Sequence, residues 1–127
     1  MKVAFTSTDG ETIDRHFGMA RTFHVWEVGP EEARFVAEVA APDGGDDEED
    51  RIAARAAAIA DCAIVCTMEI GGPAAAKLVA RKIHPMKTGS EVPVSEMVGK
   101  LQEVLKGNPP PWLRKAMGGD TPQREVR

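Results

Sequence analysis

Cys62-Ala63-Ile64-Val65-Cys66-Thr67 is a short apolar run, and Gly71-Gly72-Pro73 follows it closely. An apolar run bounded by turn signals is typical of a strand that is buried on both faces, as in a parallel sheet. Proline is favoured at the first position of a helix, so Pro73 predicts that a helix begins soon after this strand. A buried strand followed by a helix is the repeating unit of an α/β protein.

The chain before this run predicts three strands and one helix. The strands cover residues 2–7, 22–28 and 34–40, where β-branched and aromatic side chains gather between turn signals. The second and third strands are close enough along the chain to pair as a hairpin. Asp46 and Glu49 have the spacing of a capping box, which predicts a helix from there to about residue 60.

The chain after this run predicts two helices and one strand. The helix opened by Pro73 is expected to face its core with Leu78 and Val79, and residues 83–87 form a short strand. Apolar residues recur at helical spacing from 94 to 105, and Gly107 ends that helix. The predicted order is therefore β-β-β-α-β-α-β-α, a single α/β domain with a mixed sheet.

We expect residues 1–107 to form the ligand-binding domain and residues 108–127 to form a Pro-rich C-terminal tail. Three consecutive prolines predict a stiff extended segment that carries Trp112 as an apolar anchor. Trp112 either docks a partner protein or packs back on its own domain. After about residue 118 we expect disorder.

Composition limits the class of protein. A chain of 127 residues is enough for one domain with one core, and 43% hydrophobic residues are ordinary for such a domain. No apolar run approaches the roughly 18 residues of a membrane span, so we expect no contact with a membrane. The net charge of −4 argues against nucleic acid as a partner. Two cysteines make no disulfide framework and no signal-peptide pattern opens the chain, so we expect a cytoplasmic protein.

Charge is unevenly distributed along the chain. Six of the eight residues from Asp43 to Asp50 are acidic, whereas residues 70–90 contain no carboxylate. The second region carries the cations Lys77, Arg81, Lys82 and Lys87. A site for an anionic ligand is expected there, unless both regions are ordinary solvated faces.

Two loops at the carboxyl ends of predicted parallel strands contain candidate binding residues. His16 follows Arg15 in the first loop, where its imidazole can reach a metal or solvent; otherwise it is an ordinary surface histidine. In the second loop, Gly71 and Gly72 leave the helix amides open to an anion, with Lys77 about one turn further. The alternative is a tight turn that only needs glycine.

Cys62 and Cys66 are separated by about 13 Å along an extended strand, so they share neither a metal ion nor a disulfide. Cys62 is expected in the core, and Cys66, nearer the loop, is a candidate ligand contact. Asp9, Asp14 and Glu69 could gather at the strand ends and hold Mg²⁺, which is the best case for an enzyme.

Three motifs occur in order along the chain. They are Asp14-Arg15-His16-Phe17-Gly18-Met19-Ala20, then Ile70-Gly71-Gly72-Pro73, then Pro109-Pro110-Pro111-Trp112-Leu113-Arg114-Lys115. Together they resemble the dinitrogenase iron–molybdenum cofactor biosynthesis family, and the last resembles its NifX branch. The resemblance covers roughly residues 1–117.

This resemblance implies a ribonuclease-H-like α/β fold and a carrier protein that is not an enzyme. The carrier would bind an iron–sulfur precursor of the iron–molybdenum cofactor, made by NifB, and pass it to the NifEN scaffold. The family's histidine falls on His16, which becomes the expected metal ligand. The candidate contacts of the cluster are His16, Arg15, Gly71, Gly72, Lys77 and Cys66.

Two other functions stay open at this point. One is a Mg²⁺-dependent phosphoryl-transfer enzyme that uses Asp9, Asp14 and Glu69. The other is an adaptor that binds the scaffold through Trp112 without touching the cluster.

Overall fold

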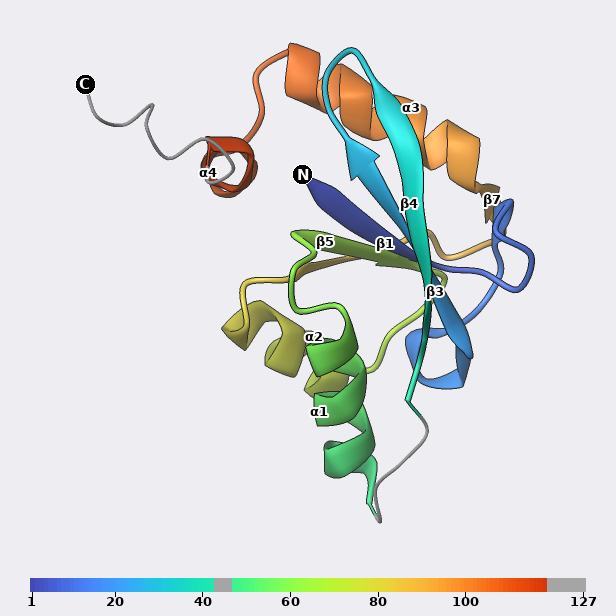
Figure 1. Ribbon diagram of the computed structural model, residues 1–127. Coiled ribbons are helices and arrows are strands. Elements are labelled where there is room, and N and C mark those ends of the chain that lie inside the picture. The colour runs from blue at the N-terminus through green and yellow to red at the C-terminus, as the bar shows by residue number, and fades with distance from the viewer. Residues whose placement is uncertain (43–46, 119–127) are drawn as a thin grey trace.

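The computed structural model describes residues 1–42 and 47–118, and within them five strands form the main sheet (Figure 1). Their order is β4-β3-β1-β5-β6. The strands are β1 (Lys2–Thr6), β3 (Thr22–Val28), β4 (Ala33–Ala40), β5 (Ile64–Thr67) and β6 (His84–Lys87). β1, β3 and β4 pair antiparallel, whereas β1, β5 and β6 pair parallel, so the sheet is mixed.

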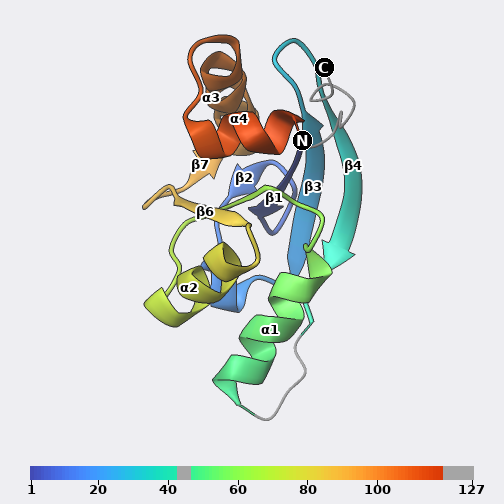
Figure 2. The ribbon, with the colours of Figure 1, turned by 90° about the vertical axis from the view of Figure 1, so that its left-hand side faces the viewer.

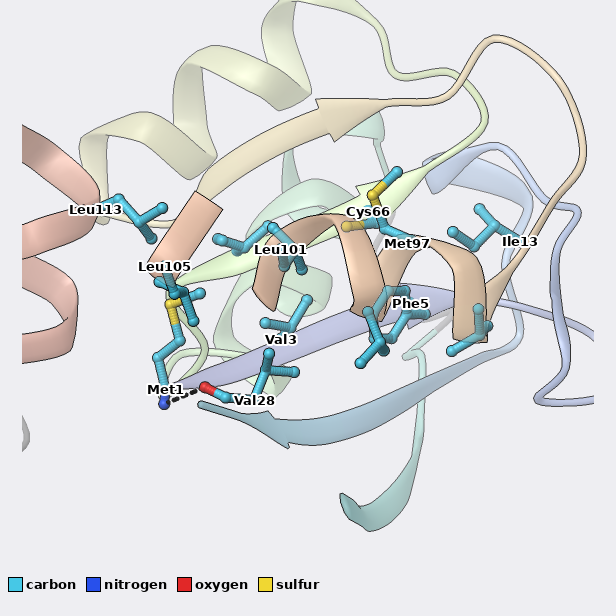
Figure 3. Packing of buried hydrophobic residues seen from close by; sticks show 13 residues of the cluster. Met1, Val3, Phe5, Ile13, Val28, Cys66, Met97, Leu101, Leu105 and Leu113 are labelled. Atoms are coloured by element: carbon cyan, nitrogen blue, oxygen red, sulfur yellow. Dashed lines mark hydrogen bonds between the residues drawn. The ribbon is translucent and has the colours of Figure 1, made fainter. Parts of the chain in front are cut away.

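Helices cover both faces of this sheet, as Figures 1 and 2 show. α1 (Glu48–Ala58) and α2 (Gly72–Ala80) lie on one face, and α3 (Val94–Lys106) and α4 (Pro111–Gly118) lie on the other. Because side chains alternate along a strand, β1 contributes to both cores. Val3 and Phe5 pack toward α3 (Figure 3), whereas Ala4 packs among the side chains of α1 and α2.

The predicted strands and the β3–β4 hairpin are confirmed. The predicted order lacks four elements that are present. A short ladder pairs β2 (Thr12–Ile13) with β7 (Val92–Pro93), and a 3₁₀ helix, η1 (Phe17–Met19), lies in the first loop. The fourth is α4. β2, β7 and η1 are only two or three residues long and carry no periodicity in the sequence, which is why the pattern does not predict them.

The start of α1 differs from the prediction. Its N-cap is Asp47, whose Oδ1 accepts a hydrogen bond of 2.8 Å from the Asp50 amide. Asp46, the predicted cap, lies outside the described residues. The run of adjacent carboxylates offers the capping spacing at more than one position, so spacing alone could not choose between them.

Two expectations about side chains and the tail are wrong. Leu78 is fully buried as predicted, but Val79 is 58% exposed. Residues 111–118 form the helix α4 instead of an extended segment. Proline is tolerated in the first turn of a helix, and Pro111 is the first residue of α4. Leu113 then buries its side chain in the core beneath α3, which holds α4 on the domain. The expectation of disorder beyond about residue 118 concerns residues that are not described.

In residues 1–42 and 47–118, no helix has the length and apolar character needed to cross a membrane.

Candidate functional site

The loop that carries His16 is held against the ends of β1 and β5 by hydrogen bonds to its backbone. The carbonyl oxygen of Arg15 accepts three of them. Their donors are Thr6 Oγ1 (2.9 Å), Thr67 Oγ1 (3.0 Å) and the Met68 amide (3.1 Å). A fourth runs from the Phe17 amide to the Glu69 carbonyl at 2.9 Å. His16 lies between these anchors, so its position is fixed although its side chain is exposed.

The 3₁₀ helix η1 secures the other side of His16. Phe17 is 1% exposed, and its ring centroid lies 5.9 Å from that of Phe23. The Met19 amide donates to the His16 carbonyl at 3.0 Å. The Met19 side chain is 66% exposed.

A cavity of about 470 Å³ opens between η1, α1 and the start of α2. His16, Met19 and Gly71 line it, so the structure brings together residues from both loops that the sequence singles out. Its apolar wall includes Phe17, Ile52 and Ile70. A volume of this size suits a compact ligand.

Two arginines of α1 also line the cavity. Arg55 is only 6% exposed, and its Nη1 donates to the Phe17 carbonyl at 3.1 Å and to the Ala20 carbonyl at 2.6 Å. Arg51 lies one turn earlier on the same helix. Neither arginine is predicted from the sequence as a site residue. An arginine four residues from another, among the buried positions Ile52 and Ala56, is the signal that could have found them.

Carboxylates share this cavity with the arginines. Glu48 and Glu69 line it, and Glu69 forms an ion pair of 3.7 Å with Lys87. The cavity therefore mixes charges, with the buried guanidinium of Arg55 nearest the protein interior and Glu48 on the exposed first turn of α1.

Gly71 and Gly72 begin α2 without any backbone requirement for glycine. Gly71 is the N-cap with φ −75°, a value that any residue adopts. A Cβ added at Gly71 would meet only Pro73 Cδ, at 3.9 Å, and one at Gly72 would have no described atom within 4 Å. The alternative of a tight turn that needs glycine therefore has no support here, and the space before the helix is open to a ligand.

Three other predicted contacts lie away from the cavity. Lys77 Nζ pairs with Glu49 at 3.3 Å, and Arg15 Nε donates to Thr8 Oγ1 at 2.9 Å. Cys66 is fully buried among the side chains beneath α3, beside Met97 in Figure 3. Gly72 adjoins the lining residue Gly71 at the helix start.

Both thiols are expected to be inert in the folded chain. Burial raises the pKa of the Cys62 and Cys66 thiols to about 12, so the reactive thiolate is scarce at neutral pH. We expect no alkylation by iodoacetamide at pH 8 without denaturant and two labels per chain in denaturant, read by mass spectrometry. A single fast label on the folded chain would contradict the burial of one thiol.

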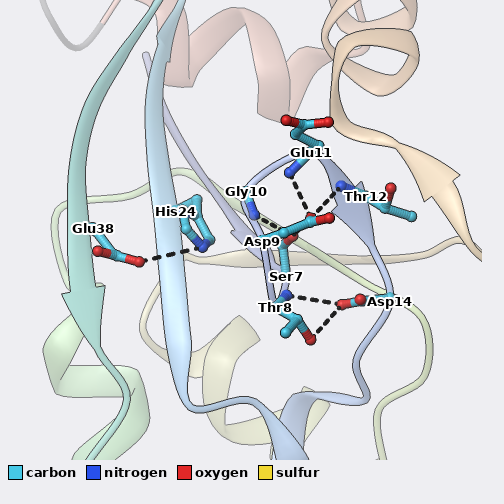
Figure 4. Close-up of polar contacts among 9 residues, drawn as sticks. All are labelled: Ser7, Thr8, Asp9, Gly10, Glu11, Thr12, Asp14, His24 and Glu38. Atoms are coloured by element: carbon cyan, nitrogen blue, oxygen red, sulfur yellow. Dashed lines mark hydrogen bonds and ion pairs between the residues drawn. The ribbon is translucent and has the colours of Figure 1, made fainter.

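The carboxylates of the first loop hold the loop itself (Figure 4). Asp9 Oδ1 accepts hydrogen bonds from the amides of Glu11 (2.9 Å) and Thr12 (3.1 Å), which lower the pKa of Asp9. Asp14 Oδ1 accepts from the Thr8 amide at 2.9 Å. Across the described part of the chain, no three or more His, Cys, Asp and Glu side chains form a group that could hold a metal ion. The phosphoryl-transfer alternative therefore gains no support from these carboxylates.

These features define a small α/β domain with a partly cationic cavity at the carboxyl ends of two parallel strands. Residues 1–104 match the family described as dinitrogenase iron-molybdenum cofactor, and the chain belongs to this family. The resemblance predicted from the three motifs is confirmed.

Curated relatives carry the names NifX and NifY. NifX of Herbaspirillum seropedicae is 44% identical over 120 residues, which cover 92% of this chain and 82% of that protein. NifX of Rhodobacter capsulatus is 40% identical and covered over 78% of its length. NifY of Azotobacter vinelandii is also 40% identical, but the chain spans only 51% of it. The fold is similar to the crystal structure of PH0822, with a TM-score of 0.65 at 23% identity, covering 81% of this chain and 89% of that one.

Proposed function

We propose that this chain is a carrier that binds an iron–sulfur precursor of the iron–molybdenum cofactor in the cavity beside His16. Membership of the family supports a role in the biosynthesis of that cofactor. In this proposal the carrier receives the precursor from NifB, delivers it to the NifEN scaffold, acts in the cytoplasm and catalyses no reaction. The cargo site lies within residues 1–107, and we assign the fold to the ribonuclease-H-like class. An antiparallel meander followed by two parallel crossover strands supports that assignment.

The observation that carries the proposal is the placement of His16. Four hydrogen bonds fix the backbone around an exposed imidazole at the mouth of a cavity that also holds Arg51 and Arg55. Imidazole suits iron as a ligand. Guanidinium groups and the open amides at the start of α2 suit a negatively charged iron–sulfur cluster that the protein holds without cysteine ligands.

The composition of this site fits a cargo that must leave again. One imidazole gives a single strong bond, and the other contacts are hydrogen bonds and charges that exchange readily. Met19 adds a soft thioether at the same mouth. The proposed contacts do not include Cys66, which is buried in the core beneath α3. They also omit Lys77 and the Arg15 side chain, which bind Glu49 and Thr8 away from the cavity.

Replacing His16 by alanine is expected to lower retention of the precursor by roughly tenfold or more, a loss on the scale of metal-site substitutions. The measurement is an anaerobic titration of the purified chain with the isolated precursor, followed by gel filtration and iron analysis. The fold should be unaffected because the His16 side chain is exposed.

Lys77→Gln is the matched control, because it removes a cation of α2 that lies outside the cavity. It should retain iron like the unmodified chain. Equal retention by the His16→Ala variant would move the site away from His16. If the unmodified chain itself retains no iron, the carrier proposal fails, and capture of the scaffold by the cargo-free chain would then favour the adaptor.

A further inference from the structure

A second cavity, of about 480 Å³, lies at the other end of α2, where β6 and α4 approach it. Figure 2 shows these three elements side by side. We call this cavity the Trp112 groove. The residues that decide its character are Val79, Lys82, His84, Trp112 and Lys115.

The floor of the Trp112 groove is an aromatic surface that remains partly open to solvent. The rings of His84 and Trp112 stack with centroids 3.9 Å apart and an interplanar angle of 22°. Burial lowers the pKa of His84, which favours its neutral ring. Trp112 is still 39% exposed, and Val79 beside it is 58% exposed. Exposed tryptophan in a concave setting is a frequent anchor of protein interfaces.

Lys82 occupies a backbone position that favours glycine. Its φ is +65°, and no other non-glycine residue in the described ranges has a positive φ. It ends α2 in a Schellman motif. The Lys82 amide donates to the Val79 carbonyl and the Ile83 amide to the Leu78 carbonyl, both at 2.9 Å. Glycine is the usual residue at this position because it has no Cβ.

A lysine here costs stability relative to glycine, and its side chain lines the Trp112 groove. Strained residues of this kind cluster at functional sites. Lys115 lines the groove from α4, so cations from two elements flank one apolar floor. None of the described residues that line the groove carries a carboxylate.

We propose that the Trp112 groove docks an acidic segment of another protein. Carboxylates of that segment face Lys82 and Lys115, and one of its apolar side chains packs beside Trp112 and Val79. The cavity beside His16 and the Trp112 groove lie at opposite ends of the nine-residue helix α2, which is about 13 Å long. A partner held in the groove is therefore held close to His16. The proposal concerns a separate surface and stands without the cargo.

The test uses the full chain and two fluorescein-labelled peptides, read by fluorescence anisotropy. One peptide carries Leu and Phe flanked by Asp and Glu, and the other carries the same apolar residues flanked by Lys. The acidic peptide should bind, and raising the salt from about 50 mM to about 500 mM should weaken the binding. The basic peptide should not bind.

Variants assign the binding to the groove. Trp112→Ala should weaken binding of the acidic peptide by about 30-fold, as expected for an interface anchor. Lys82→Gly should weaken it by about fivefold while raising the melting temperature by about 3 °C, because the backbone strain is relieved. Lys115→Gln should weaken it without that rise. Lys100→Gln, on α3, should change neither.

Several results would overturn the proposal. They are equal binding of the two peptides, no binding of the acidic peptide up to about 1 mM, and unchanged binding by both the Lys82→Gly and Lys115→Gln variants. Concentration-dependent association of the chain with itself that Trp112→Ala abolishes would assign the groove to a second copy instead. Because no cluster is added, these outcomes are independent of the carrier proposal.

Discussion

Replacing Phe17 by alanine is expected to lower the free energy of unfolding by about 3–5 kcal/mol and to abolish retention of the cluster precursor. Phe17 is 1% exposed, packs on Phe23 and immediately follows His16. The lost ring leaves a cavity beneath η1, so the backbone that presents the imidazole loses its support. Urea unfolding gives the first quantity, and anaerobic gel filtration gives the second.

Phe5→Ala is the matched control. Phe5 is equally buried, but it lies on the opposite face of the sheet, under α3. Its replacement should cost a similar free energy of unfolding and leave cluster retention intact at temperatures where the chain stays folded. Equal loss of retention in both variants would mean that retention only reports global stability. Phe17→Leu should fall between the alanine variant and the unmodified chain.

Replacing Arg55 by methionine is expected to lower the free energy of unfolding by about 2–4 kcal/mol, because two buried carbonyl groups lose a charged donor. Those carbonyls belong to Phe17 and Ala20, which bracket η1. The amide of Met19, which closes η1, should then exchange with deuterium faster than in the unmodified chain. The Arg55→Met variant should also retain less of the cluster precursor.

Arg51→Met separates charge from structure in the same cavity. Arg51 lines the cavity one turn before Arg55 and is half-buried. Loss of the Arg51 charge should weaken binding of the cluster precursor while changing the free energy of unfolding by less than about 1 kcal/mol. Arg55→Lys should restore the charge but only part of the stability, because an ammonium group lacks the planar fork of a guanidinium. Full stability in Arg55→Met would show that the two carbonyls do not depend on this side chain.

The sequence predicts one half of the candidate site well. His16 and Gly71 lie after neighbouring parallel strands, β1 and β5, whose carboxyl ends meet at one edge of the sheet. Strand pattern and turn residues are local signals, so their joint position follows from chain order alone. The same reasoning predicts the buried run of β5 and the β3–β4 hairpin.

The other half depends on packing that no local pattern encodes. Arg51 and Arg55 reach the cavity only because α1 lies across η1, and the acidic residues around the start of α1 suggest a site elsewhere. Lys77 forms an ion pair with Glu49 of α1 and not with a residue of the cavity. The prolines before Trp112 indicate an extended segment, but burial of Leu113 favours a helix.

The burial of both cysteine thiols affects how readily the chain is oxidised in air. Oxidants convert reachable thiolates to sulfenic acid and disulfides, and neither Cys62 nor Cys66 offers one. Among the described residues that line the cavity beside His16, Met19 carries the sulfur atom, and its exposed thioether is open to peroxide. Oxygen that destroys a bound cluster would thus leave the empty chain with its thiols intact. A sulfoxide formed on the exposed Met19 can be reversed by methionine sulfoxide reductases.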